Sequence, residues 1–127
     1  MILVDTSVWV DHLRSGDSRL AAALEAGRVL THPFVVGELA CGNLRNRREV
    51  LALLAELPPA PLSVQTETLA FLEAHALMGR GIGFVDVHLL ASTALASARL
   101  WTRDRRLAAV ADALGLGHEE VRRSTTP

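Results

Sequence analysis

Four acidic residues stand where the helices and strands of this chain are expected to begin or end. Asp5 directly follows a run of three apolar residues that has the length and composition of a buried strand. Asp104 follows a second short apolar run, Glu38 lies early in an expected helix, and Asp86 opens an apolar helix. Such positions can bring side chains together at one edge of a parallel sheet. Four converging carboxylates would form a site for a hard divalent cation.

Taken singly, each acid also has an ordinary explanation as a helix cap or a solvated side chain. Thr6 or Ser7 can cap the first helix, however, so Asp5 is not required there. Asp86 opens the most apolar helix, where an acid near the core needs a partner. Two carboxylates about 4 Å apart repel by about 4 kcal/mol at an effective dielectric constant of about 20. A true cluster therefore requires a cation, and an all-oxygen ligand set favours Mg²⁺ or Mn²⁺.

The length and composition indicate a globular protein. A chain of 127 residues corresponds to one domain, 1–127, in which we expect the last residues, about 122–127, to form a loose tail. No apolar run approaches the roughly 20 residues that span a bilayer, and no leader segment is recognisable. We therefore expect a soluble, cytoplasmic protein with no membrane contact. The single cysteine, Cys41, excludes an internal disulfide and is expected to be buried.

Every basic side chain apart from histidine is an arginine, because the sequence contains no lysine. This excludes Schiff-base chemistry and the phosphate-binding lysine of nucleotide-binding loops. The net charge of −1 makes the whole molecule a poor electrostatic trap for nucleic acid. Local contacts with phosphate remain open for two groups of arginines, which are otherwise solvated helix ends. They are Arg45, Arg47 and Arg48, and Arg103, Arg105 and Arg106.

Short apolar strands alternate with helical segments along the chain, which is typical of an α/β sandwich with a parallel sheet. We expect both tryptophans, Trp9 and Trp101, in the core or an interface. The predicted strands cover 1–4, 28–31 and 100–102, with an edge strand at 61–64 and a last strand at 118–121. The predicted helices cover 6–14, 19–26, 33–41, 47–57, 67–78, 85–98 and 105–114.

Four segments together resemble one protein family. They are ILVDTSVWV around Asp5, VVGELACG around Glu38, GFVDVHLLASTA around Asp86 and LWTRDRRL around Asp104. Over essentially its whole length the chain resembles the PIN-domain ribonucleases, specifically the VapC-type toxins of bacterial toxin–antitoxin pairs. The resemblance implies a PIN-like three-layer sandwich with a central, mostly parallel sheet.

The resemblance also implies a function and a set of site residues. The expected activity is endonucleolytic cleavage of RNA that depends on Mg²⁺ or Mn²⁺ and inhibits translation. It is expected to be restrained by a cognate antitoxin protein, in a chain that forms a homodimer. The catalytic and metal-binding set would be Asp5, Glu38, Asp86 and Asp104, supported by Thr6, Ser7 and Thr102.

Two other functions remain open on sequence alone. The first is a catalytically inactive PIN-like binding or regulatory module that acts through a protein partner. The second is a phosphatase with an aspartyl nucleophile, but such enzymes carry a second Asp two residues after the first, where this chain has Ser7. A response-regulator receiver is disfavoured because it needs a lysine.

Overall fold

The centre of the molecule is a parallel sheet of three short strands. The structure is a computed structural model that describes residues 1–120. The central strand β1 (Ile2–Val4) pairs with β2 (Val29–Leu30) on one side and with β3 (Arg99–Trp101) on the other. Both pairings are parallel, which confirms the predicted sheet type. The carboxyl ends of all three strands therefore meet at one edge, and the strand order reverses at β1.

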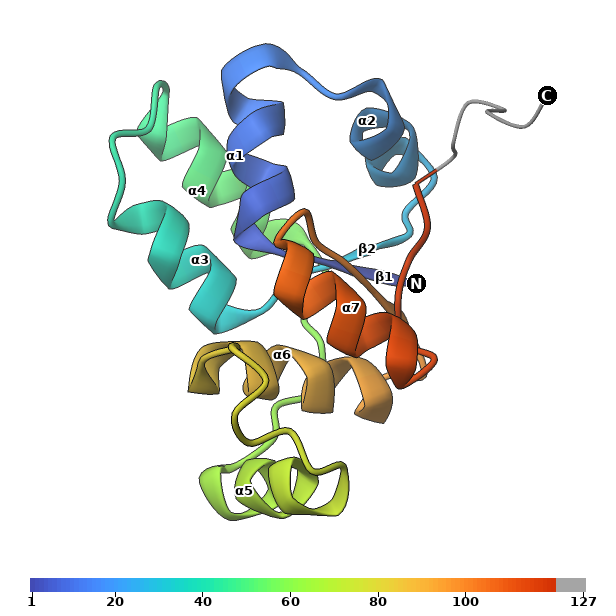
Figure 1. Ribbon diagram of the computed structural model, residues 1–127. Coiled ribbons are helices and arrows are strands. Elements are labelled where there is room, and N and C mark those ends of the chain that lie inside the picture. Colours follow the sequence, from blue (N-terminus) through green and yellow to red (C-terminus); the bar gives the residue numbers. More distant parts are fainter. Residues whose placement is uncertain (121–127) are drawn as a thin grey trace, which may run out of the picture.

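Seven helices surround this sheet within the described residues and complete an α/β sandwich, as predicted (Figure 1). Helix α6 packs against β1 and β3, and α5 covers the side of α6 that faces away from the sheet. None of these helices is long and apolar enough to cross a membrane. Their bounds are α1 Thr6–Ser15, α2 Ser18–Glu25, α3 Pro33–Ala40, α4 Arg47–Glu56, α5 Gln65–Ala74, α6 Phe84–Leu95 and α7 Arg105–Ala113.

The core lies between the sheet and these helices. All three residues of β1 are buried, and so is the middle of α6, as expected for a central helix. Trp9 and Trp101 are each at most 1% exposed, which confirms their predicted core position. Cys41 was predicted to be buried and is exposed, because it lies at the C-terminal end of α3, where the chain leaves the core.

Two helices end earlier than the sequence predicts, and the reason is the same in both. After α5, Ala76 adopts a left-handed conformation (φ 52°), and the N–H of Leu77 donates to the carbonyl of Leu72. After α6, Ser97 also adopts a left-handed conformation (φ 51°), and the N–H of Ala98 donates to the carbonyl of Thr93. This pattern is the Schellman motif, in which glycine usually takes the left-handed position. Because alanine and serine take that position here, the usual stop signal is absent from the sequence.

Two isolated bridges extend the sheet in place of the predicted outer strands. The strand predicted at 61–64 is wrong, because Thr31 pairs instead with Pro59 in a parallel bridge. Thr31 donates to the carbonyl of Pro58 and accepts from the N–H of Ala60, so the missing N–H of Pro59 is not needed. The second bridge joins Leu100 to Gly117, one residue before the strand predicted at 118–121. The end of that strand and the predicted tail at about 122–127 lie outside the described residues.

Candidate active site

Asp5 stands at the carboxyl end of the central strand and is 7% exposed. It occupies the N-cap position of α1, yet its side chain makes no capping bond. Its Oδ2 instead accepts hydrogen bonds from Thr102 Oγ1 (2.7 Å) and Ser7 Oγ (2.9 Å). The prediction that Thr6 or Ser7 is the N-cap is therefore wrong. Ser7 and Thr102 hold the Asp5 carboxylate in one orientation.

Asp104 lies in the same loop as Thr102, directly after β3. Its Oδ1 accepts a hydrogen bond from the N–H of Leu107 (3.0 Å), so Asp104 caps α7. Its own N–H donates to Thr102 Oγ1 (3.1 Å), the hydroxyl that binds Asp5. The parallel pairing of β1 and β3 thus brings Asp5 and Asp104 to one edge, as their positions after two strands predict.

Glu38 reaches the site from α3. Its Oε1 accepts a hydrogen bond from Thr6 Oγ1 (2.6 Å), which joins α3 to the first turn of α1. Thr6 thus supports Glu38, whereas Ser7 supports Asp5. Glu38 is exposed although apolar residues flank it in the sequence, because those residues face the core on the other side of the helix.

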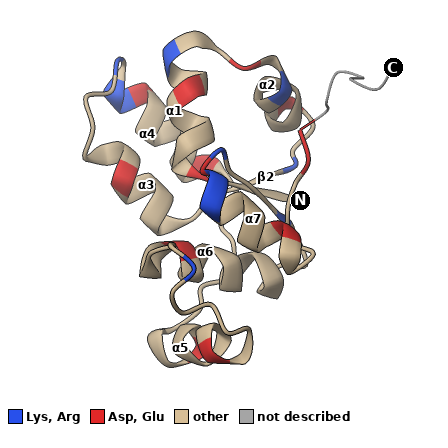
Figure 2. Cartoon of the chain, in the orientation of Figure 1, with Lys and Arg blue, Asp and Glu red and all other residues tan. Residues whose placement is uncertain are grey.

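Asp86 is half-buried in the first turn of α6, and its Oδ2 accepts a hydrogen bond from the Gly83 N–H (3.0 Å). Burial raises the pKa of Asp86, the bond from Gly83 opposes this shift, and the charges of Asp5, Asp104 and Glu38 raise the pKa further. The charges of the other three acids therefore reach Asp86. In Figure 2, acidic segments lie on α3, at the start of α6 and where α1 and α7 begin.

The donor chemistry of this group fits a hard divalent cation. Each of the four acids uses one oxygen for a hydrogen bond, and the other oxygen has no partner among residues 1–120. None of the four forms an ion pair with the described cationic side chains. In the same part of the chain, no three Asp, Glu, His or Cys side chains are arranged to hold a metal ion among them. The fit therefore rests on uncompensated charge and oxygen donors, which Mg²⁺ and Mn²⁺ prefer.

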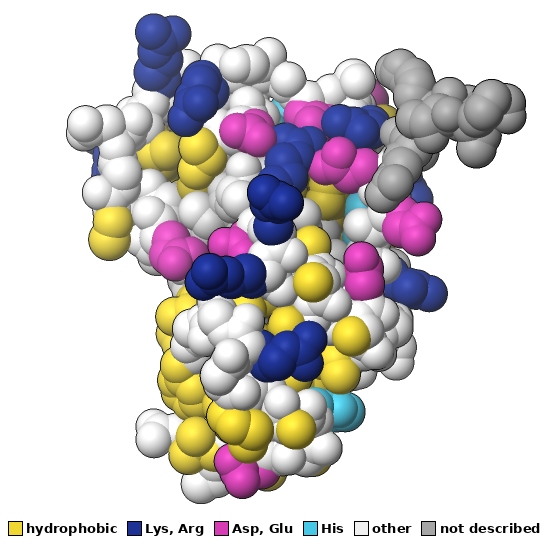
Figure 3. All heavy atoms as spheres, viewed as in Figure 1, with side chains coloured by type: hydrophobic (Ala, Val, Ile, Leu, Met, Phe, Trp, Pro, Cys, Tyr) yellow, Lys and Arg dark blue, Asp and Glu magenta, His cyan; other side chains and the backbone are white. Residues whose placement is uncertain are grey.

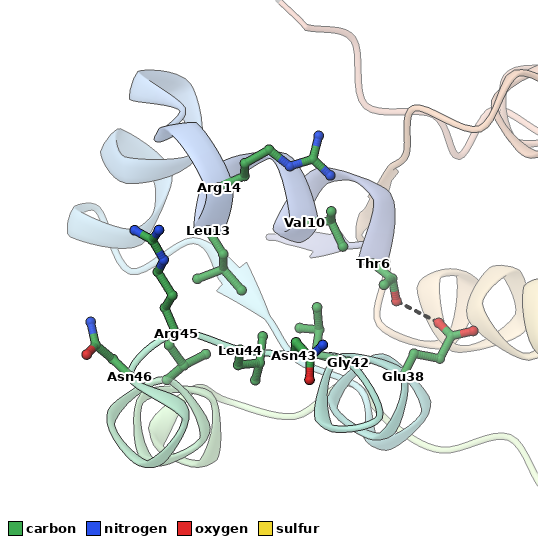
Figure 4. A pocket seen from close by; sticks show the side chains of 12 residues that line it. Thr6, Val10, Leu13, Arg14, Glu38, Gly42, Asn43, Leu44, Arg45 and Asn46 are labelled. Atoms are coloured by element: carbon green, nitrogen blue, oxygen red, sulfur yellow. Dashed lines mark hydrogen bonds between the residues drawn. The ribbon is translucent and has the colours of Figure 1, made fainter.

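A groove of about 680 Å³ begins at the Thr6–Glu38 bond and runs between α1, α3 and the segment that joins α3 to α4. Figure 4 shows Thr6 and Glu38 at one end and the side chains of Arg14 and Arg45 toward the other. The groove thus changes from acidic to basic along its length. Asn43 and Asn46 add polar groups to its lining, and the remaining lining residues are Val10, Leu13, Leu39, Gly42, Leu44 and Val50.

The two arginine groups singled out in the sequence differ in the structure. Arg45 lines the groove, and its neighbour Arg47 donates to the carbonyl of Gly42 (3.3 Å). Arg103, in the other group, is engaged by carboxylates of its own chain and is not free to contact phosphate. No local sequence pattern distinguishes Arg103 from the two arginines that follow it, Arg105 and Arg106.

Comparisons with known proteins agree with this fold. The PIN domain family matches residues 2–113. Ribonuclease VapC32 from two strains of Mycobacterium tuberculosis, CDC 1551 / Oshkosh and H37Rv, is 47% identical over 121 residues, which are 94% of this chain and 98% of the relative. The crystal structure of FitAcB from Neisseria gonorrhoeae aligns with a TM-score of 0.58 and 23% identity, over 88% of this chain and 94% of the other. At that identity the likeness shows the fold alone.

Proposed function

The chain belongs to the PIN domain family and to its VapC type, and on that premise we propose that it is a divalent-metal-dependent endoribonuclease. It acts as the toxin of a toxin–antitoxin pair and hydrolyses phosphodiester bonds of RNA, which inhibits translation. The observation that carries this proposal is a group of four acids, of which Asp5 and Asp104 lie at the carboxyl edge of the sheet and Glu38 and Asp86 lie on α3 and α6. Each keeps one oxygen without a hydrogen-bond partner among residues 1–120, and none is neutralised there by an arginine.

In this proposal Asp5 and Asp104 are the inner ligands, and Glu38 and Asp86 complete the shell or orient the attacking water. When bound there, Mg²⁺ or Mn²⁺ would lower the pKa of a water molecule and would neutralise charge on the phosphate oxygens. The hydroxyls of Ser7 and Thr102 fix one oxygen of Asp5, which leaves its second oxygen for a ligand.

Thr6 and Gly83 orient the other two acids, Glu38 and Asp86, in the same way. They fix one oxygen of Glu38 and one oxygen of Asp86. The pKa of Asp86 is raised, which favours this carboxylate as the group that accepts a proton from the attacking water. Hydrolysis then forms a bond from the water oxygen to phosphorus and breaks the bond to the leaving sugar oxygen.

The test is endonuclease activity of the purified protein, free of any partner, on total bacterial RNA. The proposal predicts discrete fragments that form only with Mg²⁺ or Mn²⁺. The alternative is a catalytically inactive PIN-like module that acts through a protein partner. A folded protein that binds Mn²⁺ but cleaves no RNA would favour that alternative.

We propose that the RNA substrate lies along the groove that starts at Thr6 and Glu38, with phosphates on Arg14 and Arg45. The planar guanidinium groups match phosphate oxygens, and both arginines are exposed. Replacing either Arg14 or Arg45 with Gln is expected to raise KM roughly 10- to 100-fold with little change in kcat, since a bond to a charged group contributes about 1.5–3 kcal/mol.

Steady-state cleavage at several salt concentrations checks this expectation. In either variant, the slope of the logarithm of the binding constant against the logarithm of the salt concentration should become shallower by about one. This change corresponds to the loss of one phosphate contact. Arg28→Gln is the matched control, because Arg28 is exposed next to the amino end of β2, at the opposite edge of the sheet. Equal KM values for the Arg45 variant and this control would place the RNA elsewhere.

We also propose that a cognate antitoxin protein restrains the activity by covering or distorting the site. The acidic group and the groove are exposed enough to be covered together by a single protein partner. Co-expression with this partner should suppress cleavage, and removal of the partner should restore it.

We further propose that the chain forms a homodimer through its exposed apolar face. Figure 3 shows hydrophobic side chains gathered over the part of the molecule that contains α5 and α6. Phe34 and Phe84 both pack edge-on against His88 and are still 40% exposed, so α3 and α6 present adjoining apolar surface. Other large exposed apolar residues in this part of the chain are Leu62, Val64, Leu69, Met78, Val85 and Leu95.

Sedimentation equilibrium at micromolar concentration is therefore expected to give twice the 13.7 kDa of one chain. The physical reason is that contiguous apolar patches on a soluble protein usually mark an interaction surface. A mass of one chain across the accessible concentration range would contradict the homodimer.

A further inference from the structure

Arg103 is the centre of an ion network outside the acidic site. Its Nη1 donates to Asp11 at 2.8 Å, its Nη2 to Asp17 at 2.5 Å and its Nε to Glu120 at 2.8 Å. The guanidinium also lies over the Trp101 ring, 5.7 Å from the ring centroid. These hydrogen bonds outweigh burial and raise the pKa of Arg103. One side chain thus ties the loop after β3 to α1, to the start of α2 and to the C-terminal segment.

The backbone of Arg103 leads from this network directly to the site. Its N–H donates to Ser7 Oγ (2.9 Å), and that hydroxyl donates to Asp5 Oδ2 (2.9 Å). Arg103 also stands between Thr102, which binds Asp5, and Asp104, which is itself one of the four acids. Two of the three residues in this short loop therefore belong to the acidic site, and the third belongs to the network.

We propose that Arg103 is a positioning residue for the acidic site, an inference that rests on the proposed nuclease function. Its three bonds to carboxylates fix the backbone of the loop, and the loop fixes Ser7, Thr102 and Asp104 around Asp5. Arg103 touches neither RNA nor metal in this role. It acts through the hydroxyls that orient Asp5 and through the backbone that carries Asp104.

The geometry of the network requires arginine at this position. A guanidinium offers donors in several directions within one plane, whereas a lysine ammonium is a single point charge on a flexible stem. Lysine therefore preserves the charge at position 103 but cannot meet three carboxylates from three segments at once. Figure 3 shows acidic and basic side chains interleaved on this part of the surface.

Arg19 provides a matched control. It belongs to the same network through Glu120 (3.2 Å) and Asp17 (3.7 Å), but it has no bond to Ser7 or to the loop after β3. Its side chain is 44% exposed. Removing Arg19 therefore weakens the network without releasing the loop, which separates a structural role from a positioning role.

The test compares Arg103→Lys and Arg19→Ala with the wild-type chain. Mn²⁺ affinity is measured by calorimetry, kcat and KM by RNA cleavage, and folding by circular dichroism and thermal melting. Arg103→Lys is expected to weaken Mn²⁺ binding and to lower kcat, each roughly 10–100-fold, as loss of a residue that orients a metal ligand does. KM should change little. Arg19→Ala should lower the melting temperature and leave Mn²⁺ affinity and kcat at the wild-type values.

If Arg103→Lys does not fold, Asp11→Ala removes one of the three bonds and should lower Mn²⁺ affinity by a smaller factor. Folded Arg103 and Asp11 variants with wild-type Mn²⁺ affinity and kcat would overturn the positioning role, as would a wild-type chain that binds no Mn²⁺. If the wild-type chain binds Mn²⁺ without cleaving RNA, the nuclease proposal fails, and the Mn²⁺ affinities alone still decide the role of Arg103.

Discussion

Replacing Asp5 with Asn is expected to abolish RNA cleavage, with a fall in kcat of at least about 100-fold, while the protein stays folded. The loss of a residue that merely orients a metal ligand already costs about 10–100-fold, and Asp5 is proposed as a ligand itself. Asparagine has nearly the same shape, and its carbonyl oxygen can accept the bonds from Ser7 and Thr102. Its amide nitrogen, however, replaces the free oxygen and cannot bind a cation.

The same change is expected to raise the free energy of unfolding slightly. Asp5 is buried without a cationic partner among residues 1–120 and contributes to the electrostatic field that raises the pKa of Asp86. Removing one negative charge relieves this repulsion. Urea denaturation and RNA cleavage on the same preparation check both effects. Glu25→Gln, an exposed acid at the end of α2, is the control and should behave as the wild type in both assays.

His32 is expected to make the protein less stable in acid by about 3 kcal/mol between pH 6.5 and pH 4, from its pKa shift and the linkage relation. Its ring is 1% exposed and caps α3, because Nδ1 accepts a bond from the Phe34 N–H (3.0 Å). Burial first, and the nearby His88 second, lower the pKa of His32 from 6.5 to about 4. The unfolded chain therefore binds more protons below pH 6.5. The stabilisation is complete above pH 6.5 and is lost as the pH falls to about 4.

Free energies of unfolding across this pH range, for the wild type and for His32→Asn, test the expectation. Asparagine also caps helices well, so the variant keeps a bond to the Phe34 N–H and loses only the titration and some ring packing. His118, whose pKa is lowered by burial, titrates in both proteins and cancels in the difference. The two curves should approach each other toward pH 4. Curves that stay parallel across this pH range would show that the pKa of His32 is the same in the folded and the unfolded chain.

The sequence predicted that Asp5 and Asp104 lie at one edge of the sheet, because that argument depended only on strand direction. Asp5 and Asp104 each follow a short apolar strand, and parallel pairing of β1 with β3 brings both to one edge. Glu38 and Asp86 start from helices, so their approach to that edge could not be deduced from periodicity. For these two, the prediction depended on their positions near the starts of helices and on the family resemblance.

The errors at the start of α1 and in the arginine group around Arg103 have a common physical origin in contacts between distant segments. Thr6 and Ser7 were expected to cap α1, but Thr6 bonds to Glu38 on α3 and Ser7 bonds to Asp5 and the loop after β3. Arg103 could not be separated from its arginine neighbours, because its partners come from α1, α2 and the C-terminal segment. No window of local sequence contains these partners.

The central claim is tested most directly by measuring two properties of the purified, partner-free chain on the same preparation. These are its affinity for Mn²⁺ and its cleavage of RNA. The wild type should produce discrete RNA fragments with Mg²⁺ or Mn²⁺, and EDTA should stop the reaction. Asp5→Asn, although folded, should give neither fragments nor wild-type Mn²⁺ affinity. Cleavage that persists in EDTA, or full activity in folded Asp5→Asn, would contradict the account.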